Sequence, residues 1–282
     1  MPCANGLGEG PLWDHDLALL YWVDIAAQRI HWFDPDSGLK GHWQLPVRAS
    51  ALALRNDGTL LVATDRGFGT FNPRTSAFAL QLHPEPEREG NRSNDGHADV
   101  KGRFWIGTMD DTERSSSGAL YRLDPDWSVT RVLDHLGIPN TVLCTADGRA
   151  LYVADSKSRE LFRFTVGSSG SLHDPKLLAR LAPDEGAPDG SALDEEGFLW
   201  NAQWGASRIV RYAPDGEVDR IVNVPVGQPT SCTFGGRDLS TLFITSARKG
   251  LSEQALAREP LAGGVFAFTP GVRGLVASRF GG

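Results

Sequence analysis

A six-fold repeat is the feature that most constrains the fold of this chain. Six segments share one layout, in which a short apolar strand is followed by a polar turn and a second, often aromatic, strand. The second strands begin roughly every 40 to 48 residues, which is the period of four-stranded propeller blades. We expect them at residues 21–24, 61–64, 105–108, 152–155, 200–203 and 243–246. The repeat therefore predicts an all-β, six-bladed β-propeller.

Turn chemistry separates the expected strands along the whole chain. Segments such as Asp34–Gly38 and Asp194–Gly197 combine Asp with Gly, which is typical of tight turns between antiparallel strands. Only Ser252–Arg258, just before Pro260, has a short helical pattern. No shift in composition marks a boundary, and 282 residues suit one propeller. We therefore predict a single domain over residues 1–282.

Charge and cysteine usage exclude several classes of protein. The net charge of −7, with both signs interspersed, argues against a nucleic-acid or anionic-membrane surface. No apolar run approaches the roughly 18 residues of a membrane-spanning helix, and the first residues lack a secretory signal pattern. Cys3, Cys144 and Cys232 are odd in number and irregularly spaced, so they predict neither a disulfide framework nor a zinc site. We expect a cytoplasmic monomer.

Polar residues recur at one phase of the repeat, near the start of the strand that precedes each second strand. In a propeller these strands begin around one end of a central channel, so their first side chains should converge. Any one of these residues alone would be a typical turn residue. Their common phase favours a metal site over a set of unrelated turns. They are Glu9, Ser50, Asn94 or Asp95, Asn140, Asp189 and Ser231.

Glu9, Asn140 and Asp189 offer two carboxylates and one carboxamide oxygen. Such hard ligands suit Ca²⁺, Mg²⁺ or Mn²⁺, with Zn²⁺ and Fe²⁺ as alternatives, and three of them leave coordination positions open. The chain has no H-E-x-x-H, G-x-S-x-G or phosphate-binding loop motif. His97, close to Asn94, is the only histidine near this set. We therefore predict one divalent metal ion as the cofactor.

Five motifs follow one another along nearly the whole chain, at residues 8–13, 92–96, 102–109, 188–190 and 231–236. Together they resemble the regucalcin/gluconolactonase (senescence marker protein-like) family. The segment Trp200–Gly205 is closer to the bacterial sugar lactonases of that family. The resemblance implies a six-bladed propeller with one divalent cation in its channel, held by Glu9, Asn140 and Asp189. It also implies that Asp189 is the acid/base and that Arg92 and Asn94 contact substrate.

Three departures from the family pattern bear on the site. Thr141 follows Asn140 where the family usually has Gly, a change expected to tilt the turn that carries the ligand. The segment Asp110–Glu113 has no clear counterpart of the family's substrate-contacting acid. The chain begins only eight residues before Glu9, so closure of the propeller is expected to depend on strands around Val265–Phe268.

The resemblance implies hydrolysis of a small-molecule sugar lactone, such as a glucono-, arabinono- or galactonolactone, to the free aldonic acid. The cation would polarise the lactone carbonyl, while Asp189 would move a proton from the attacking water to the ring oxygen. Arg92 and Asn94 would orient the sugar hydroxyls. Two alternatives stay open: a non-catalytic calcium-binding or regulatory propeller, and a broader esterase or organophosphate hydrolase on the same scaffold. The guanidinium of Arg92 favours an enzyme, because cation binding alone does not need it.

Overall fold

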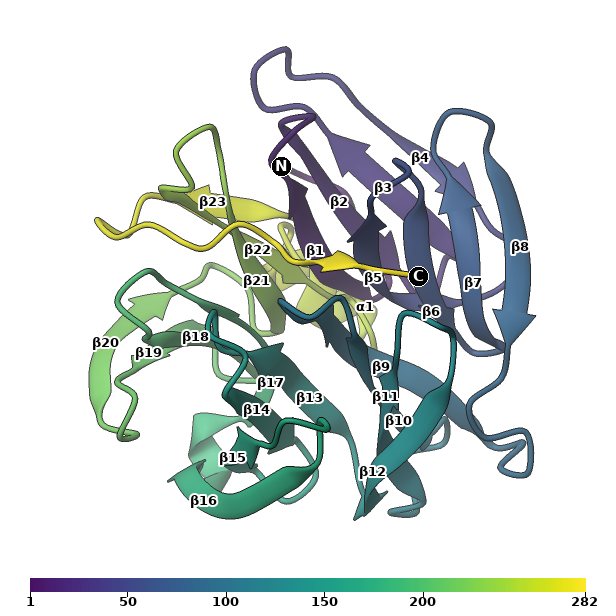
Figure 1. Ribbon diagram of the computed structural model, residues 1–282. Helices are drawn as coiled ribbons and strands as arrows, with labels where there is room; N and C mark the ends of the chain where they lie inside the picture. Colours follow the sequence, from purple (N-terminus) through teal and green to yellow (C-terminus); the bar gives the residue numbers. More distant parts are fainter. The chain divides into compact units, whose positions relative to one another are not determined.

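The computed structural model describes residues 1–282, which form six sheets of consecutive antiparallel strands (Figure 1). The chain divides into two compact units with three of these sheets each. Unit 1 comprises residues 1–48 and 181–276, and unit 2 comprises residues 49–180 and 277–282. The six sheets confirm the all-β class and the number of blades. A single domain over residues 1–282 stays a prediction.

Unit 1 contains three sheets and the short helices. No helix of the structure is long and apolar enough to cross a membrane. The first sheet is β1 (Gly8–Asp14), β2 (Leu19–Asp24), β3 (Arg29–Phe33) and β4 (Lys40–Gln44). The second is β17 (Ala187–Leu193), β18 (Leu199–Trp204), β19 (Arg208–Tyr212) and β20 (Val218–Asn223), preceded by the 3-10 helix Pro183–Glu185. The third is β21 (Pro229–Gly235), β22 (Thr241–Ser246) and β23 (Phe266–Phe268), with α1 (Glu253–Arg258) between β22 and β23.

Unit 2 contains the other three sheets. The first is β5 (Ala49–Arg55), β6 (Leu60–Thr64), β7 (Gly67–Asn72) and β8 (Ala77–Leu82). The second is β9 (Asn91–Ala98), β10 (Phe104–Asp110), β11 (Gly118–Leu123) and β12 (Val129–Leu136). The third is β13 (Pro139–Cys144), β14 (Ala150–Asp155), β15 (Glu160–Val166) and β16 (Leu172–Arg180). A last strand, β24 (Arg279–Phe280), runs parallel to β5.

The repeat predicts the second strands correctly, since β2, β6, β10, β14, β18 and β22 contain the expected residues. Helix α1 also lies where it is expected, and the Ser252 hydroxyl caps it by accepting from the Ala255 amide. The tryptophans at one phase of the repeat are core residues: Trp105 and Trp200 are fully buried. Each indole N–H donates to the aspartate six residues earlier, at 2.8 and 2.9 Å. A buried indole thus keeps a hydrogen-bond partner.

Residues before β1 hold the β21–β22–β23 sheet of unit 1. No regular strand precedes β1, but the Asn5 amide donates to the Gly263 carbonyl at 2.9 Å, and the Asn5 side chain donates to the same oxygen. Asn5 also accepts from the Trp22 indole, and Leu7 forms an isolated bridge with Ala247. The short segment before β1 therefore fixes the β21–β22–β23 sheet through several contacts, although it forms no regular strand.

His31 makes the stability of unit 1 dependent on pH. Its ring stacks on Trp22 at 4.9 Å, and its buried Nε2 has no hydrogen-bond partner. Burial, reinforced by His42, lowers the pKa of His31 to about 4. Because the unfolded pKa is about 6.5, folding opposes protonation, so stability is full above pH 6.5 and falls as the pH drops toward 4.

We expect His31 to remove about 2–3 kcal/mol from the free energy of unfolding between pH 7 and pH 4.5. Urea unfolding at both pH values measures this loss. His31→Phe keeps an aromatic ring on Trp22 without the titration, so its loss over the same interval should be smaller by that amount. The matched control is His15→Phe, at an exposed histidine. An equal loss in His31→Phe and wild type would contradict the assignment.

Candidate functional site

Every first strand of the six sheets carries a β-bulge at or next to the polar residue singled out by the repeat. In β1 the register shifts after Glu9, in β13 it shifts after Asn140, and in β17 Asp189 lies within the bulge. Asn94 and Asp95 occupy the bulge of β9. Bulges re-aim side chains and are frequent next to active sites. The common phase read from the sequence is therefore a common backbone feature. The remaining bulges lie at Ser50 and Thr230.

In unit 2 the bulges of β9 and β13 are joined by a chain of side-chain hydrogen bonds. Arg92 donates to Asn94 Oδ1 at 2.9 Å, and Asn94 Nδ2 donates to Asn140 Oδ1 at 3.0 Å. Asn140 Nδ2 then donates to Ser156 Oγ at 2.8 Å. Arg92 and Asn140 are only 6 % and 4 % exposed. Three of the predicted site residues, Arg92, Asn94 and Asn140, are thus brought into one polar network.

Asp111 extends this network in unit 2. Its carboxylate forms an ion pair with Arg92 Nε at 2.9 Å. The loop that carries Asp111 leaves β10 beside the start of β9, and the Asp111 amide donates to the Gly90 carbonyl at 3.0 Å. Asp111 fixes one edge of the guanidinium and Asn94 another. Arg92 is therefore oriented before any ligand arrives.

Asn140 fits the role of an oxygen ligand. An amide oxygen has two lone pairs, and the bond from Asn94 occupies one of them. The bond from Asn140 Nδ2 to Ser156 fixes which way the amide points. Together with the carboxylates of Glu9 and Asp189, this donor set is all oxygen, which suits a hard divalent cation.

The turn after Asn140 keeps a left-handed backbone despite its β-branched residue. Thr141 has φ of 52°, the same value as Gly10 after Glu9, and the expected tilt of this turn stays a prediction. A non-glycine residue there stores about 1–3 kcal/mol of strain. Asp95 offsets it by accepting from the Val142 amide at 3.1 Å. Burial raises the pKa of Asp95 to about 6.

Glu9 and Asp189 belong to unit 1. Glu9 Oε2 accepts from the Gly10 amide at 3.2 Å. Asp189 is 5 % exposed, and its carbonyl accepts from Asn201 Nδ2 at 3.0 Å. The next residue, Gly190, packs so closely that a Cβ there would lie 2.1 Å from Ser231 Oγ. Both carboxylates thus sit on strongly constrained backbone.

The structure contains no group of three or more His, Cys, Asp or Glu side chains arranged to hold a metal ion. The predicted set includes an amide and is divided between the units, with Asn140 in unit 2. Convergence of Glu9, Asn140 and Asp189 on one ion stays a prediction. His97 lies in β9 opposite Trp105, and burial lowers its pKa to about 4. Its imidazole is therefore neutral at pH 7.

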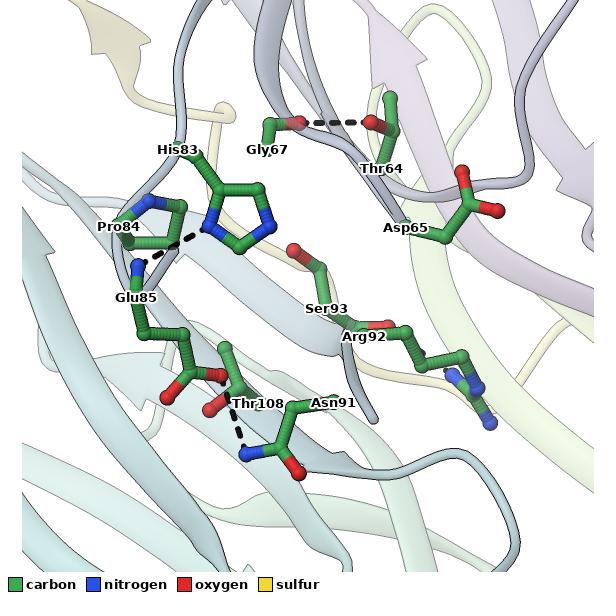
Figure 2. A pocket seen from close by; sticks show the side chains of 10 residues that line it. All are labelled: Thr64, Asp65, Gly67, His83, Pro84, Glu85, Asn91, Arg92, Ser93 and Thr108. Atoms are coloured by element: carbon green, nitrogen blue, oxygen red, sulfur yellow. Dashed lines mark hydrogen bonds between the residues drawn. The ribbon is translucent and has the colours of Figure 1, made fainter. Parts of the chain in front are cut away.

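A shallow pocket in unit 2 includes Arg92 of the network in its lining (Figure 2). Its buried Glu85 already accepts from Tyr121 at 2.8 Å and from Asn91 at 3.2 Å. Arg92 lines the pocket, but its guanidinium points away from His83 and Glu85 (Figure 2). The Glu85 carboxylate already has hydrogen-bond partners within the protein. We therefore interpret this pocket as packing between two sheets rather than as a reaction site.

Comparison with known proteins places these features in a family context. Residues 7–248 match the model of the SMP-30/gluconolactonase/LRE-like region. L-arabinolactonase of Azospirillum brasilense is 38 % identical, over 99 % of this chain and 93 % of its own length. 6-Deoxy-6-sulfogluconolactonase of Pseudomonas putida is 34 % identical, over 98 % and 94 %.

A solved structure with the same fold is that of a calcium-binding protein, regucalcin, from Agrobacterium tumefaciens. It is 32 % identical and superposes with a TM-score of 0.93 over 99 % of this chain and 95 % of its own. The predicted six-bladed β-propeller is thereby confirmed. The chain belongs to the SMP-30/gluconolactonase/LRE-like family.

Proposed function

We propose that this protein is a divalent-metal-dependent hydrolase that opens the lactone ring of a sugar acid to the free aldonic acid. The observation that carries the proposal is the hydrogen-bonded network Asp111–Arg92–Asn94–Asn140 of unit 2, in which Arg92 and Asn140 are buried. It joins a fixed guanidinium, suited to sugar hydroxyls and carbonyls, to a candidate cation ligand. Relatives named L-arabinolactonase and 6-deoxy-6-sulfogluconolactonase support the same substrate class.

The proposed cation is Ca²⁺, Zn²⁺, Mn²⁺, Mg²⁺ or Fe²⁺, held by Glu9, Asn140 and Asp189. When bound, it would supply Lewis-acid chemistry at the lactone carbonyl. Asp189 takes a proton from the attacking water and gives it to the ring oxygen as the ring C–O bond breaks. The product is the hydroxy acid, so atoms and charge balance without a further reactant.

Arg92 and Asn94 bind and orient the sugar. Arg92 is already held by Asp111 and Asn94, so little side-chain entropy is lost when substrate arrives. Its contacts to hydroxyls are made equally in the ground and transition states. Arg92 therefore contributes mainly to KM, whereas Asp189 contributes to kcat.

The substrate class can be tested with two lactones of equal ring size, one an aldonolactone and one without hydroxyl groups. We expect kcat/KM to favour the aldonolactone by roughly a hundredfold or more, because two buried polar groups left unpaired cost about 1–3 kcal/mol each. Proton release measures both rates. Arg92→Ala should raise KM for the aldonolactone and reduce the preference.

Equal kcat/KM values in the wild type would instead support the broader esterase. The solved relative described as calcium-binding favours a second candidate, a calcium-binding propeller without catalysis. That candidate would be supported by stoichiometric Ca²⁺ binding with no hydrolysis of any lactone, whichever metal is added. Cytoplasmic location and a monomeric state stay predictions from the sequence.

A further inference from the structure

One hydrogen-bond arrangement occurs in both units at the backbone of a predicted ligand. In unit 2, Asn94 Nδ2 donates at 3.0 Å to the carbonyl of Pro139, the residue before Asn140. In unit 1, Thr230 Oγ1 donates at 2.5 Å to the carbonyl of Gly8, the residue before Glu9. Each donor lies in the bulge of a first strand adjacent to the strand that carries the ligand. In each unit, therefore, a side chain of the adjacent first strand holds the peptide that precedes a predicted metal-ligand residue.

Thr230 is fully buried, and its hydroxyl has a defined role as a donor. Its proton is committed to Gly8, so the 2.8 Å contact with Thr245 Oγ1 must be a bond that Thr230 accepts. Thr245 is also fully buried, and its hydroxyl shares its single proton between Thr230 Oγ1 and the Ser231 carbonyl, to which it donates at 3.3 Å. The hydroxyl cannot turn away from Gly8 without leaving a buried oxygen unpaired, which costs about 1–3 kcal/mol.

The backbone that receives this bond has no room to adjust. A Cβ on Gly8 would lie 2.8 Å from both the Ser246 carbonyl and Asn5 Nδ2. The carbonyl of Gly8 belongs to the same rigid peptide plane as the amide of Glu9. Fixing that carbonyl therefore fixes the Glu9 amide and restricts the direction in which the Glu9 side chain leaves the strand, immediately before the left-handed Gly10.

We propose that Thr230 is a positioning residue for Glu9, holding the Gly8–Glu9 peptide so that the Glu9 carboxylate is oriented toward a divalent cation. Thr230 touches neither cation nor substrate; it acts through the backbone of Glu9. The inference rests on the proposed role of Glu9 as a cation ligand. Outer hydrogen bonds of this kind typically change metal affinity by about 10–100-fold.

The test is the substitution Thr230→Val, which removes the hydroxyl and keeps the shape. Metal-stripped protein is titrated calorimetrically with Ca²⁺ and, separately, with Mn²⁺ alone. We expect the Kd for the tighter-binding metal to rise about tenfold or more. Thr230→Ser, which keeps the donor, should stay within about threefold of the wild type. The matched control is Thr233→Val in the same strand, where Kd should not change.

A second readout needs no metal and no activity. Amide hydrogen exchange of the peptide covering β1 should be faster in metal-free Thr230→Val than in wild type, and unchanged in Thr233→Val. If Thr230→Val does not fold, Thr230→Cys replaces it, because a thiol is a weak donor and should give an intermediate Kd.

The outcomes separate this inference from the proposed function. Suppose Glu9→Gln weakens metal binding but Thr230→Val matches the wild type in Kd and exchange. Then the positioning role is overturned and the metal site stands. If Glu9→Gln leaves Kd unchanged, Glu9 is not a ligand, and both the site and the role of Thr230 fail.

Discussion

Asp189→Asn is expected to lower kcat for an aldonolactone by about 10²–10⁴-fold while the protein keeps most of its divalent metal. The amide retains an oxygen ligand but cannot accept a proton from water. Asp189 is 5 % exposed in β17, so the substitution changes a constrained position without changing its size. Proton release measures kcat, and elemental analysis after metal loading measures the bound ion.

Two further variants sharpen this prediction. Asp215→Asn makes the same chemical change at an exposed turn and should leave kcat unchanged. The double variant Glu9→Gln/Asp189→Asn should lose the single equivalent of metal, because it replaces both carboxylate ligands. A full equivalent of metal in the double variant would contradict the ligand set, and an unchanged kcat in Asp189→Asn would contradict the acid/base role.

Arg211→Met is expected to reduce the free energy of unfolding by about 3–5 kcal/mol. Arg211 is 4 % exposed and donates to Asp194, Glu196 and Asp219, while its guanidinium lies 3.8 Å over the Phe198 ring. Asp194 is fully buried. Removing the cation leaves that carboxylate without a counter-charge in the core, although the Trp200 indole and the Glu196 and Phe198 amides still donate to it.

Urea unfolding of the variant and the wild type measures this loss. Arg237→Met is the control, since Arg237 forms an exposed ion pair with Asp36 and such pairs contribute about 0–1 kcal/mol. The two substitutions remove the same charge and differ in burial. Similar losses in both variants would contradict the inference that burial makes the Arg211 ion pairs costly to break.

The sequence predicts the fold well because the blade is a repeated physical unit. Each second strand is buried on both faces. Apolar residues therefore recur with the period of the blade, even where the blades differ in the rest of their sequence. The position that Glu9, Asn140 and Asp189 share in the repeat could be recognised for the same reason. Each lies close to a bulge that ends regular pairing at the start of a first strand.

Two functional candidates could not be found in this way. Asp111 meets Arg92 only because the loop after β10 turns back on Gly90, and no local pattern predicts that contact. Thr230 was missed by one residue, since counting along the repeat selects Ser231. A bulge inserts one extra residue, which shifts the side chain that faces the neighbouring strand. Sequence spacing does not reveal where the insertion falls.

The hydrogen bonds between Asn5 and Gly263 span 258 positions of the chain, which has a consequence for its synthesis. At about 5–20 residues per second, Asn5 and the adjacent β1 leave the ribosome roughly 10–50 seconds before Gly263 exists. β1 is an edge strand of its sheet from the start, and such edges recruit strands from other chains. The bulge after Glu9, together with its charge, interrupts the row of free backbone groups there. We expect the feature that orients a cation ligand in the finished protein also to protect the nascent chain from aggregation.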